Sequence, residues 1–428
     1  MKTRALLALA GCLLALSTRA DDWPQFRGPN RDNASKETGL LKAWPEAGPK
    51  LLWTYKDAGT GYSGPAIVGD TLYTMGARGD DEFLIALDLT KTPPVQKWAE
   101  KIGPTFTTKG NIWNKGPSSS PTVANGYVYA LGGFGDLICV TTDGKFIWRV
   151  ALVKDLKGEI NPIQNTPGTL AWGYAGSPLV DGDKLICVPG GPNGTVAALD
   201  AKKGNVVWRS VMFTEQATYT SPVMATLGGI KQYIVMVQDG VAGIDADGNL
   251  LWRYQRSNPY DEILASTPVV KDDLVFISGV KGGTELLKVT AAAGKFKAEQ
   301  VFKDRRLENF VGGTALVGDT IYGCSGMGRS EWFAFDLKKQ KLAWRKADTD
   351  VPQGAVTAAD GKLYLLDEKG DVGLAEASPK EWNLISHFTL PEESKLRLPS
   401  SRVWTVPVVA DGKLYLRDQE LLFCYQVK

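Results

Sequence analysis

Histidine is nearly absent from this sequence of 428 residues, in which His387 is the single example. Its scarcity excludes a zinc site built from several histidines, haem attachment through a Cys-x-x-Cys-His run, and any Ser-His-Asp triad that does not use His387. His387 itself lies in an alternating, strand-like segment, which indicates a structural role. Any usual catalytic role of histidine in this chain would therefore have to be filled by His387.

Cysteine is also scarce, and no two cysteines are close enough in the chain to form a local motif. The five cysteines stand more than 40 residues apart, with no adjacent pair and no Cys-x-x-Cys. The chain thus carries no redox or zinc signature. Four of them lie in apolar alternating segments, which predicts buried side chains without disulfides; these are Cys139, Cys187, Cys324 and Cys424.

Neither sign of charge is in excess. The sequence has 49 Lys and Arg against 47 Asp and Glu, a net charge of +2. Residues 1–20 contain three of the basic residues and no acidic one, so the chain without them has 46 basic and 47 acidic side chains, a charge of −1. A near-neutral chain lacks the basic field that nucleic acid or an anionic membrane surface requires.

Residues 1–20 have the pattern of an export signal. A short basic start is followed by the apolar stretch 5–16 and by a small-x-small cleavage site that ends at Ala20. The apolar stretch is too short to span a bilayer as a permanent helix. The run LAGC at 9–12 resembles a lipobox, so lipidation of Cys12 is the alternative to cleavage after Ala20. We expect an exported protein, periplasmic or extracellular, which is anchored to the outer membrane if Cys12 is lipidated.

The length of the chain points to repetition. A single core stops growing at roughly 250 to 300 residues, so a longer chain consists of several domains or of a repeat array. Eight similar units are present, each with an apolar run, a two-residue turn of Gly, Asp or Asn, and a second alternating run, which predicts a β-hairpin. The units begin at residues 63, 119, 176, 220, 266, 312, 353 and 405.

The second half of each unit adds two more strands. In the copy at 198–208, a third strand ends at Asp200, a turn contains Gly204, and a fourth strand carries Trp208. Four strands in about 47 residues match a propeller blade. The predicted fold is all-β, an eight-bladed β-propeller of four-stranded antiparallel blades over residues 51–428.

Closure of the ring follows from the two ends of this region. The eighth unit stops after its third strand, whereas residues 50–55 resemble a fourth strand with no unit before it. We therefore predict that the N-terminal strand completes the last blade, which removes an open sheet edge. Residues 21–50 would be an extended arm on the propeller.

A tryptophan recurs at one position of the fourth strand, and we expect each copy to pack between neighbouring blades. The fifth and seventh units lack this tryptophan, which predicts weaker or shifted packing there. The predicted docking residues are Trp53, Trp98, Trp148, Asp200, Gly204, Trp208, Trp252 and Trp344.

The Ala-x-Asp-x-x-x-Gly-x-x-x-Trp pattern at 198–208 resembles the docking motif of pyrroloquinoline-quinone-like (PQQ-like) propeller repeats. The resemblance extends over residues 51–428. It implies the propeller fold, and a family that includes both PQQ-dependent dehydrogenases and non-enzymatic propellers of the BamB type, which act in outer-membrane assembly.

For a dehydrogenase of this family, the resemblance implies a vicinal disulfide under the cofactor, carboxylate and amide ligands for calcium, and an aspartate base. The sequence has no adjacent cysteines, and no ligand set stands at matching positions. No catalytic residue, metal site or cofactor is therefore predicted; the alternative is PQQ with calcium.

Loops that lead into the first, innermost strand of each blade carry aromatic and polar side chains. Because propeller loops at one rim converge on the central channel, we expect these residues to share a funnel. Such side chains suit an extended peptide, a sugar or a planar cofactor, although the rings could instead pack together and plug the channel. The predicted funnel residues are Tyr62, Trp113, Asn114, Lys115, Trp172, Tyr174, Tyr219, Tyr260, Arg402 and Trp404.

A complete blade pattern without a complete catalytic set predicts a non-catalytic, monomeric propeller that binds protein or acts as an assembly scaffold at the bacterial cell envelope. One alternative is a divergent PQQ-dependent dehydrogenase, in which Trp113, Trp172 or Trp404 stacks on the quinone and Lys115 or Arg402 holds its carboxylates. A further alternative is a carbohydrate-binding propeller.

Overall fold

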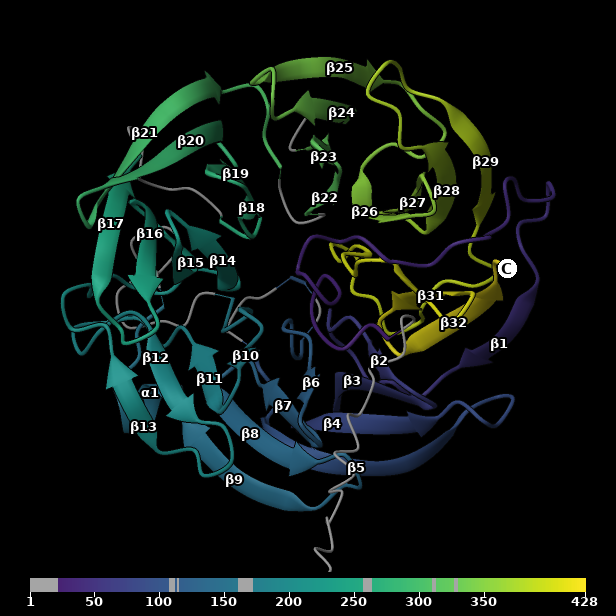
Figure 1. Ribbon diagram of the computed structural model, residues 1–428. Coiled ribbons are helices and arrows are strands. Elements are labelled where there is room, and N and C mark those ends of the chain that lie inside the picture. The colour runs from purple at the N-terminus through teal and green to yellow at the C-terminus, as the bar shows by residue number, and fades with distance from the viewer. Residues whose placement is uncertain are drawn as a thin grey trace, which may run out of the picture.

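The computed structural model describes residues 22–107, 112–113, 115–160, 172–256, 264–309, 313–326 and 330–428. In this part of the chain, eight four-stranded antiparallel sheets follow one another around a ring (Figure 1). The predicted eight-bladed propeller is therefore confirmed. The proposed signal, with Cys12, lies outside the described residues.

Blades 1 to 4 each contain four consecutive strands, from the innermost to the outermost. Blade 1 consists of β2 (Ala66–Val68), β3 (Thr71–Arg78), β4 (Asp81–Asp88) and β5 (Val95–Pro104). Blade 2 consists of β6 (Thr122–Ala124), β7 (Tyr127–Leu131), β8 (Asp136–Thr141) and β9 (Phe146–Ala151), followed by the short helix α1 (Leu152–Leu156). Blade 3 consists of β10 (Leu179–Asp181), β11 (Lys184–Cys187), β12 (Ala197–Asp200) and β13 (Val206–Arg209). Blade 4 consists of β14 (Val223–Leu227), β15 (Ile230–Val237), β16 (Gly240–Asp245) and β17 (Leu250–Gln255).

Blades 5 to 7 repeat this order, and blade 8 combines the two ends of the ring. Blade 5 consists of β18 (Val269–Lys271), β19 (Leu274–Gly279), β20 (Gly283–Ala292) and β21 (Lys295–Asp304). Blade 6 consists of β22 (Thr314–Val317), β23 (Thr320–Ser325), β24 (Glu331–Asp336) and β25 (Lys341–Ala347). Blade 7 consists of β26 (Gly354–Ala359), β27 (Lys362–Asp367), β28 (Asp371–Glu376) and β29 (Leu384–Thr389). Blade 8 consists of β30 (Val408–Ala410), β31 (Lys413–Asp418), β32 (Leu421–Gln426) and β1 (Leu51–Tyr55).

Blade 8 closes the ring as the sequence predicted. β1 pairs antiparallel with β32, and Thr54 lies opposite Phe423. The N-terminal strand thus covers what would otherwise be an unpaired edge. In Figure 1 the purple β1 lies beside the yellow β32.

The same bulge occurs between the third and fourth strands of every blade. In blade 3, Ala198 lies opposite Trp208 and Leu199 opposite Val206, so one residue of the outer strand is left over just before the tryptophan. A bulge increases the local twist of a strand and redirects its side chains. Here the redirected side chain faces the next blade.

Several of the recurring tryptophans donate a hydrogen bond to the next blade. The indole nitrogens of Trp98, Trp148, Trp208 and Trp344 lie 3.2, 3.0, 3.0 and 2.9 Å from backbone carbonyl oxygens in the turn between the third and fourth strands of the following blade. Trp252 differs, because its indole donates to Gln232 of its own blade at 2.7 Å. The four cysteines of the propeller are buried and free, as predicted.

The turn glycine allows this contact. Gly204 has φ +76°, and a Cβ atom built on it would lie 2.8 Å from the Trp148 ring. Gly361 has a similar φ of +70°, but a Cβ atom there would meet nothing within 4 Å. The two positions therefore separate the cost of the left-handed backbone from the cost of crowding the tryptophan.

We expect Gly204→Ala to destabilise the fold more than Gly361→Ala. Both substitutions should cost about 1–2 kcal/mol for the left-handed conformation. Gly204→Ala should cost about 1–3 kcal/mol more, since the methyl group overpacks the ring of Trp148. Urea unfolding of both variants measures the difference, and equal losses would contradict this packing of neighbouring blades.

Blade 7 has no tryptophan in its outer strand, and a residue from outside the repeats fills the place. In blades 1, 2, 6 and 8, the ring of the recurring tryptophan packs on a tyrosine of the second strand; in blade 2 the Trp148 and Tyr129 centroids are 6.1 Å apart. In blade 7 the equivalent Tyr364 packs on Trp44, with centroids 5.9 Å apart. The backbone N–H of Trp44 donates to Ser386, which occupies the tryptophan position of β29. Blade 7 is thus completed by the N-terminal arm.

Blade 5 uses a different residue. Phe302 stands after the bulge in β21, and its ring centroid is 4.8 Å from that of Phe335 in blade 6. The contact between blades is therefore kept with a smaller ring.

The first part of the N-terminal arm, residues 22–41, runs over the centre of the ring (Figure 1). Its side chains and backbone hydrogen-bond to every blade, mostly at or just before the innermost strand. The backbone partners, one from each blade, are Ile67, Val123, Ser177, Pro222, Thr267, Thr314, Ala358 and Val427. The arm therefore links all eight blades across the channel.

Candidate functional site at the channel mouth

A pocket of about 450 Å³ lies at the mouth of the central channel, on the face where the chain enters the innermost strands. This volume falls in the range of ligand-binding pockets. The loops of several blades meet here because each of them precedes an innermost strand. Six predicted funnel residues line the pocket: Tyr62, Trp113, Trp172, Tyr219, Arg402 and Trp404.

Two groups of rings form the walls. On one side Trp113, Trp172 and Tyr219 make a row, with centroids 5.3 and 5.7 Å apart. On the other side Tyr62 and Trp404 pack at 5.2 Å. These distances are typical of aromatic pairs. Since both groups still face the pocket, the rings pack in part on one another and in part line open space.

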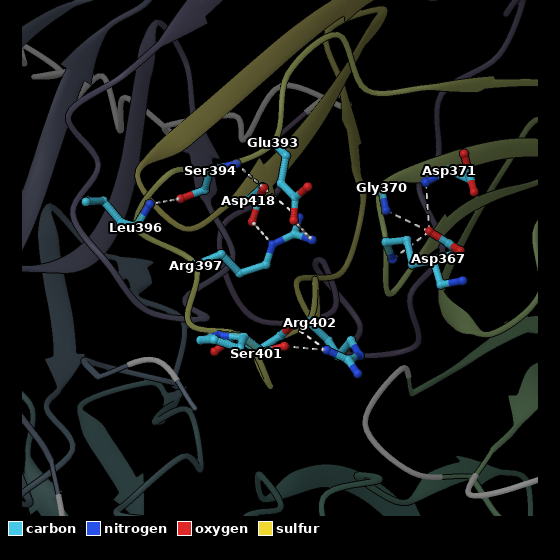
Figure 2. A network of polar contacts seen from close by, with 12 residues as sticks. Asp367, Gly370, Asp371, Glu393, Ser394, Leu396, Arg397, Ser401, Arg402 and Asp418 are labelled. Carbon is cyan, nitrogen blue, oxygen red and sulfur yellow. Dashed lines mark hydrogen bonds and ion pairs between the residues drawn. The ribbon is translucent and has the colours of Figure 1, made fainter. Parts of the chain in front are cut away.

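The segment between β29 and β30 carries Arg402 and Trp404. Arg397 anchors it: its guanidinium donates two hydrogen bonds, at 2.7 and 3.2 Å, to the buried carboxylate of Asp418 in β31. Asp418 also accepts the backbone N–H of Ser394 at 2.8 Å. Figure 2 shows this anchor above Arg402, whose guanidinium donates to the carbonyl of Ser401 at 2.9 Å. The rim of the pocket is thus fixed to blade 8.

Glu368 supplies the one carboxylate among the described residues that line the pocket. It accepts the indole N–H of Trp404 at 2.7 Å and the side-chain amide of Gln353 at 3.2 Å. Burial raises the pKa of Glu368, an effect that the hydrogen bond from Trp404 and the charge of Arg402 oppose. Glu368 therefore holds the Trp404 ring in place.

The turn that presents Glu368 is itself stabilised by a carboxylate. Asp367 accepts the backbone N–H groups of Lys369, Gly370 and Asp371 at 2.7–2.8 Å. Figure 2 shows Asp367 pointing at Gly370 and Asp371. Local hydrogen bonding of this kind fixes the shape of a turn.

The N-terminal arm provides the floor. Trp23, Phe26 and Arg27 line the pocket from below. The Arg27 guanidinium donates to the carbonyls of Thr267 and Thr314, at 3.0 and 2.5 Å, and so spans blades 5 and 6. The pocket is therefore bounded both by loops of the propeller and by a segment outside the repeats.

The remaining predicted funnel residues lie elsewhere. Tyr174 is buried beneath the loops, and its hydroxyl donates to the carbonyl of Pro189 at 2.9 Å. Lys115 is exposed and does not line the pocket. Asn114 and Tyr260 lie outside the described residues.

Glu368, Gln353 and the arm residues were not predicted from the sequence. Glu368 follows the second strand of blade 7, whereas the predicted funnel residues precede first strands. Gln353 does precede the first strand, but it is neither aromatic nor charged. The arm has no repeat to align with. Its one usable signal is the pair of arginines in FRGPNR at 26–31, which stand close together among residues without charge.

PQQ with calcium, the alternative cofactor, was tested against this pocket. The resemblance implies a cystine, an aspartate base, and carboxylate and amide ligands. The described lining residues include no cysteine or aspartate, and their single carboxylate and amide are bonded to each other. Within the described ranges no three His, Cys, Asp or Glu side chains gather as metal ligands. The described lining does not fit that group, and we derive no chemistry through it.

No helix in the described part of the chain is long and apolar enough to cross a bilayer.

The fold resembles several solved propellers. The structure of BamB from Moraxella catarrhalis matches with a TM-score of 0.59 and 15% identity, covering 89% of this chain and 98% of that one. Quinohemoprotein alcohol dehydrogenase from Comamonas testosteroni matches with a TM-score of 0.67 and 12% identity, covering 96% and 81%. At these identities the likeness concerns the fold alone.

Sequence comparison is more specific. The outer membrane protein assembly factor BamB of Burkholderia pseudomallei (strain K96243) is 23% identical over 383 residues, which cover 80% of this chain and 92% of that protein. The family described as outer membrane protein assembly factor BamB matches residues 96–346, which is more than half of the chain. Together with the eight PQQ-like blades, this match shows that the chain belongs to the BamB family of propellers.

Proposed function

We propose that this protein is an exported, non-catalytic propeller that binds protein at the bacterial cell envelope and serves there as an assembly scaffold. The pocket at the channel mouth is the observation that carries this proposal. Its walls consist of Trp, Tyr and Arg side chains, the types that most often dominate binding energy at protein interfaces. The name of its relatives, outer membrane protein assembly factor, supports the same role.

The proposed partner is an extended peptide or loop of another protein. Such a segment can place one side chain between the two aromatic walls, while its backbone follows the rim. The near-neutral charge of the chain argues against nucleic acid as the partner. We propose that the protein is a monomer and that membrane attachment, if present, is through a lipid on Cys12.

The test uses substitutions in both walls. Trp404→Ala and Trp172→Ala should each weaken partner capture about 30-fold, because loss of a hot-spot tryptophan costs about 2 kcal/mol or more. Capture is measured with tagged protein and solubilised cell envelopes, followed by quantitative mass spectrometry. Met212→Ala is the matched control, since Met212 is 78% exposed beyond β13 and does not line the pocket.

The proposal is refuted if both tryptophan variants capture the same proteins at wild-type levels. Thermal unfolding of each variant, run alongside, separates loss of binding from loss of fold.

The dehydrogenase alternative makes a different prediction. Added PQQ and calcium should give neither an absorbance change nor dye reduction with the purified protein; a saturable signal would overturn the non-catalytic role. Retention on a glycan array that is lost in Trp404→Ala would instead favour the carbohydrate-binding alternative.

A further inference from the structure

Two buried guanidinium groups lie in the channel under the pocket. Arg27 and Arg31 are 2% and 3% exposed. Arg31 donates to the carbonyls of Ser177, Pro178 and Pro222 and to the side-chain oxygen of Gln25. Within the described residues both arginines donate to neutral oxygens, and neither forms an ion pair.

The surroundings compensate these charges only in part. Burial lowers the pKa of Arg27 to about 10, while the carboxylate of Asp32 acts in the opposite direction. Burial lowers the pKa of Arg31 to about 9, and the neighbouring charge of Arg27 lowers it further. The charge of Asp32 thus acts on Arg27 and not on Arg31, and burial raises the pKa of Asp32 itself.

Arg27 also has unused hydrogen-bonding capacity. Its Nε atom is buried and has no hydrogen-bond partner in the described part of the chain. A buried charge without a counter-ion is costly, and a bound anion would reduce that cost. Arg27 lines the pocket floor, so an anion in the pocket would be near it.

The rim adds little net charge. Arg402 and Glu368 lie in the same pocket and act on each other electrostatically. Their charges largely offset, so the excess positive charge of the pocket comes from the floor.

Building on the proposed binding role of this pocket, we propose that it selects ligands that carry a carboxylate beside an aromatic ring, and that Arg27 is the residue that sets this selectivity. The ring would lie between the Trp113–Trp172–Tyr219 row and the Tyr62–Trp404 pair, where aromatic packing is favourable. The carboxylate would point to the floor. This chemistry could come from the end of a peptide chain or from a free aromatic acid.

A matched pair of probes tests the charge preference. N-acetyl-tryptophan and N-acetyl-tryptophan amide share the ring and differ in the carboxylate. We expect the acid to bind the wild-type protein at least about tenfold more tightly, measured by isothermal titration calorimetry. Equal affinities would overturn the inference without any substitution.

Substitutions then locate the preference. Arg27→Gln should bring the acid-to-amide ratio close to one, whereas Arg27→Lys should retain it. A residue that only supported the fold would weaken both probes alike and leave the ratio unchanged. Arg402→Gln, at the rim, should keep the preference for the acid. If the acid-to-amide ratio instead falls to one in Arg402→Gln and stays high in Arg27→Gln, the rim sets the selectivity and the role of Arg27 is contradicted.

Two further probes show whether the natural ligand is the end of a peptide chain or a free aromatic acid. A Gly-Ser-Gly-Ser-Trp peptide with a free carboxylate should bind more tightly than N-acetyl-tryptophan if the natural ligand is a peptide end, and equally if it is a small acid. Either result supports the shared chemistry, provided that the amidated peptide binds more weakly. If the acid binds more tightly than the amide but Trp404→Ala leaves partner capture unchanged, the scaffold function alone is refuted. If partner capture depends on the pocket but the acid and the amide bind equally, only this inference is refuted.

Discussion

Replacement of Arg417 by methionine should lower the free energy of unfolding by about 3–5 kcal/mol, the range expected when a buried polar network loses its charged centre. Arg417 lies in β31 of blade 8 and is 0% exposed. Its guanidinium donates to the carbonyls of Ser63, Met75 and Gln419 at 2.6–2.7 Å. Methionine fills similar space but would leave these buried acceptors unpaired.

The position of these acceptors makes the effect large. Ser63 leads into blade 1 and Met75 lies in β3, so Arg417 joins the last blade to the first. It also donates to the carbonyl of Gly59 at 2.9 Å, which together with Ser63 brackets Tyr62. We therefore expect the Arg417→Met protein to lose pocket binding as well as stability.

Urea unfolding followed by fluorescence checks the prediction. Arg306→Met is the matched control, because the Arg306 side chain is 73% exposed and should cost less than about 0.5 kcal/mol. A loss at Arg417 no greater than that at Arg306 would show that Arg417 does not hold the ring closed.

Substitution of Trp44 by alanine should cost about 3–5 kcal/mol, as for a tryptophan of a protein core. Trp44 lies outside the repeats, yet it is 6% exposed and packs on Tyr364 and Phe388 with centroids 5.9 and 5.5 Å away. The substitution would leave a cavity beside blade 7, which has Ser386 instead of a tryptophan at that position of its outer strand.

Lys42→Ala is the control, since Lys42 belongs to the same segment and is exposed. Thermal unfolding of the two variants should show a clear decrease for Trp44→Ala only. An unchanged midpoint for Trp44→Ala would mean that the arm merely rests on blade 7.

The blades and their closure could be predicted because their signals are local and repeated. A turn glycine such as Gly204 and a tryptophan such as Trp208 recur at fixed spacing, and each repeat folds into the same four strands. The pairing of β1 with β32 followed by counting strands, since one strand was missing at one end and one was left over at the other.

The substitutes for missing tryptophans could not be predicted in the same way. Trp44 reaches Ser386 across 342 positions of the chain, and no repeat aligns the two. Phe302 stands at the tryptophan position of blade 5 only because of the bulge, which the sequence pattern does not reveal.

The candidate site was predictable where it depends on topology. Tyr62, Trp172 and Trp404 precede innermost strands, so they must lie on one face near the channel. The floor was not predictable, because Arg27 contacts blades 5 and 6 across 240 and 287 positions. Such contacts depend on the path of a single arm, which has no periodicity.

In-cell photocrosslinking tests the binding role of the pocket most directly. The photoreactive amino acid p-benzoylphenylalanine replaces Trp404 in one strain and Met212 in another, and crosslinked products are identified by mass spectrometry. If the channel mouth is where partners bind, position 404 should yield a discrete envelope-protein adduct that position 212 does not. Adducts from position 212 with none from position 404 would place the binding surface elsewhere on the propeller and contradict the account.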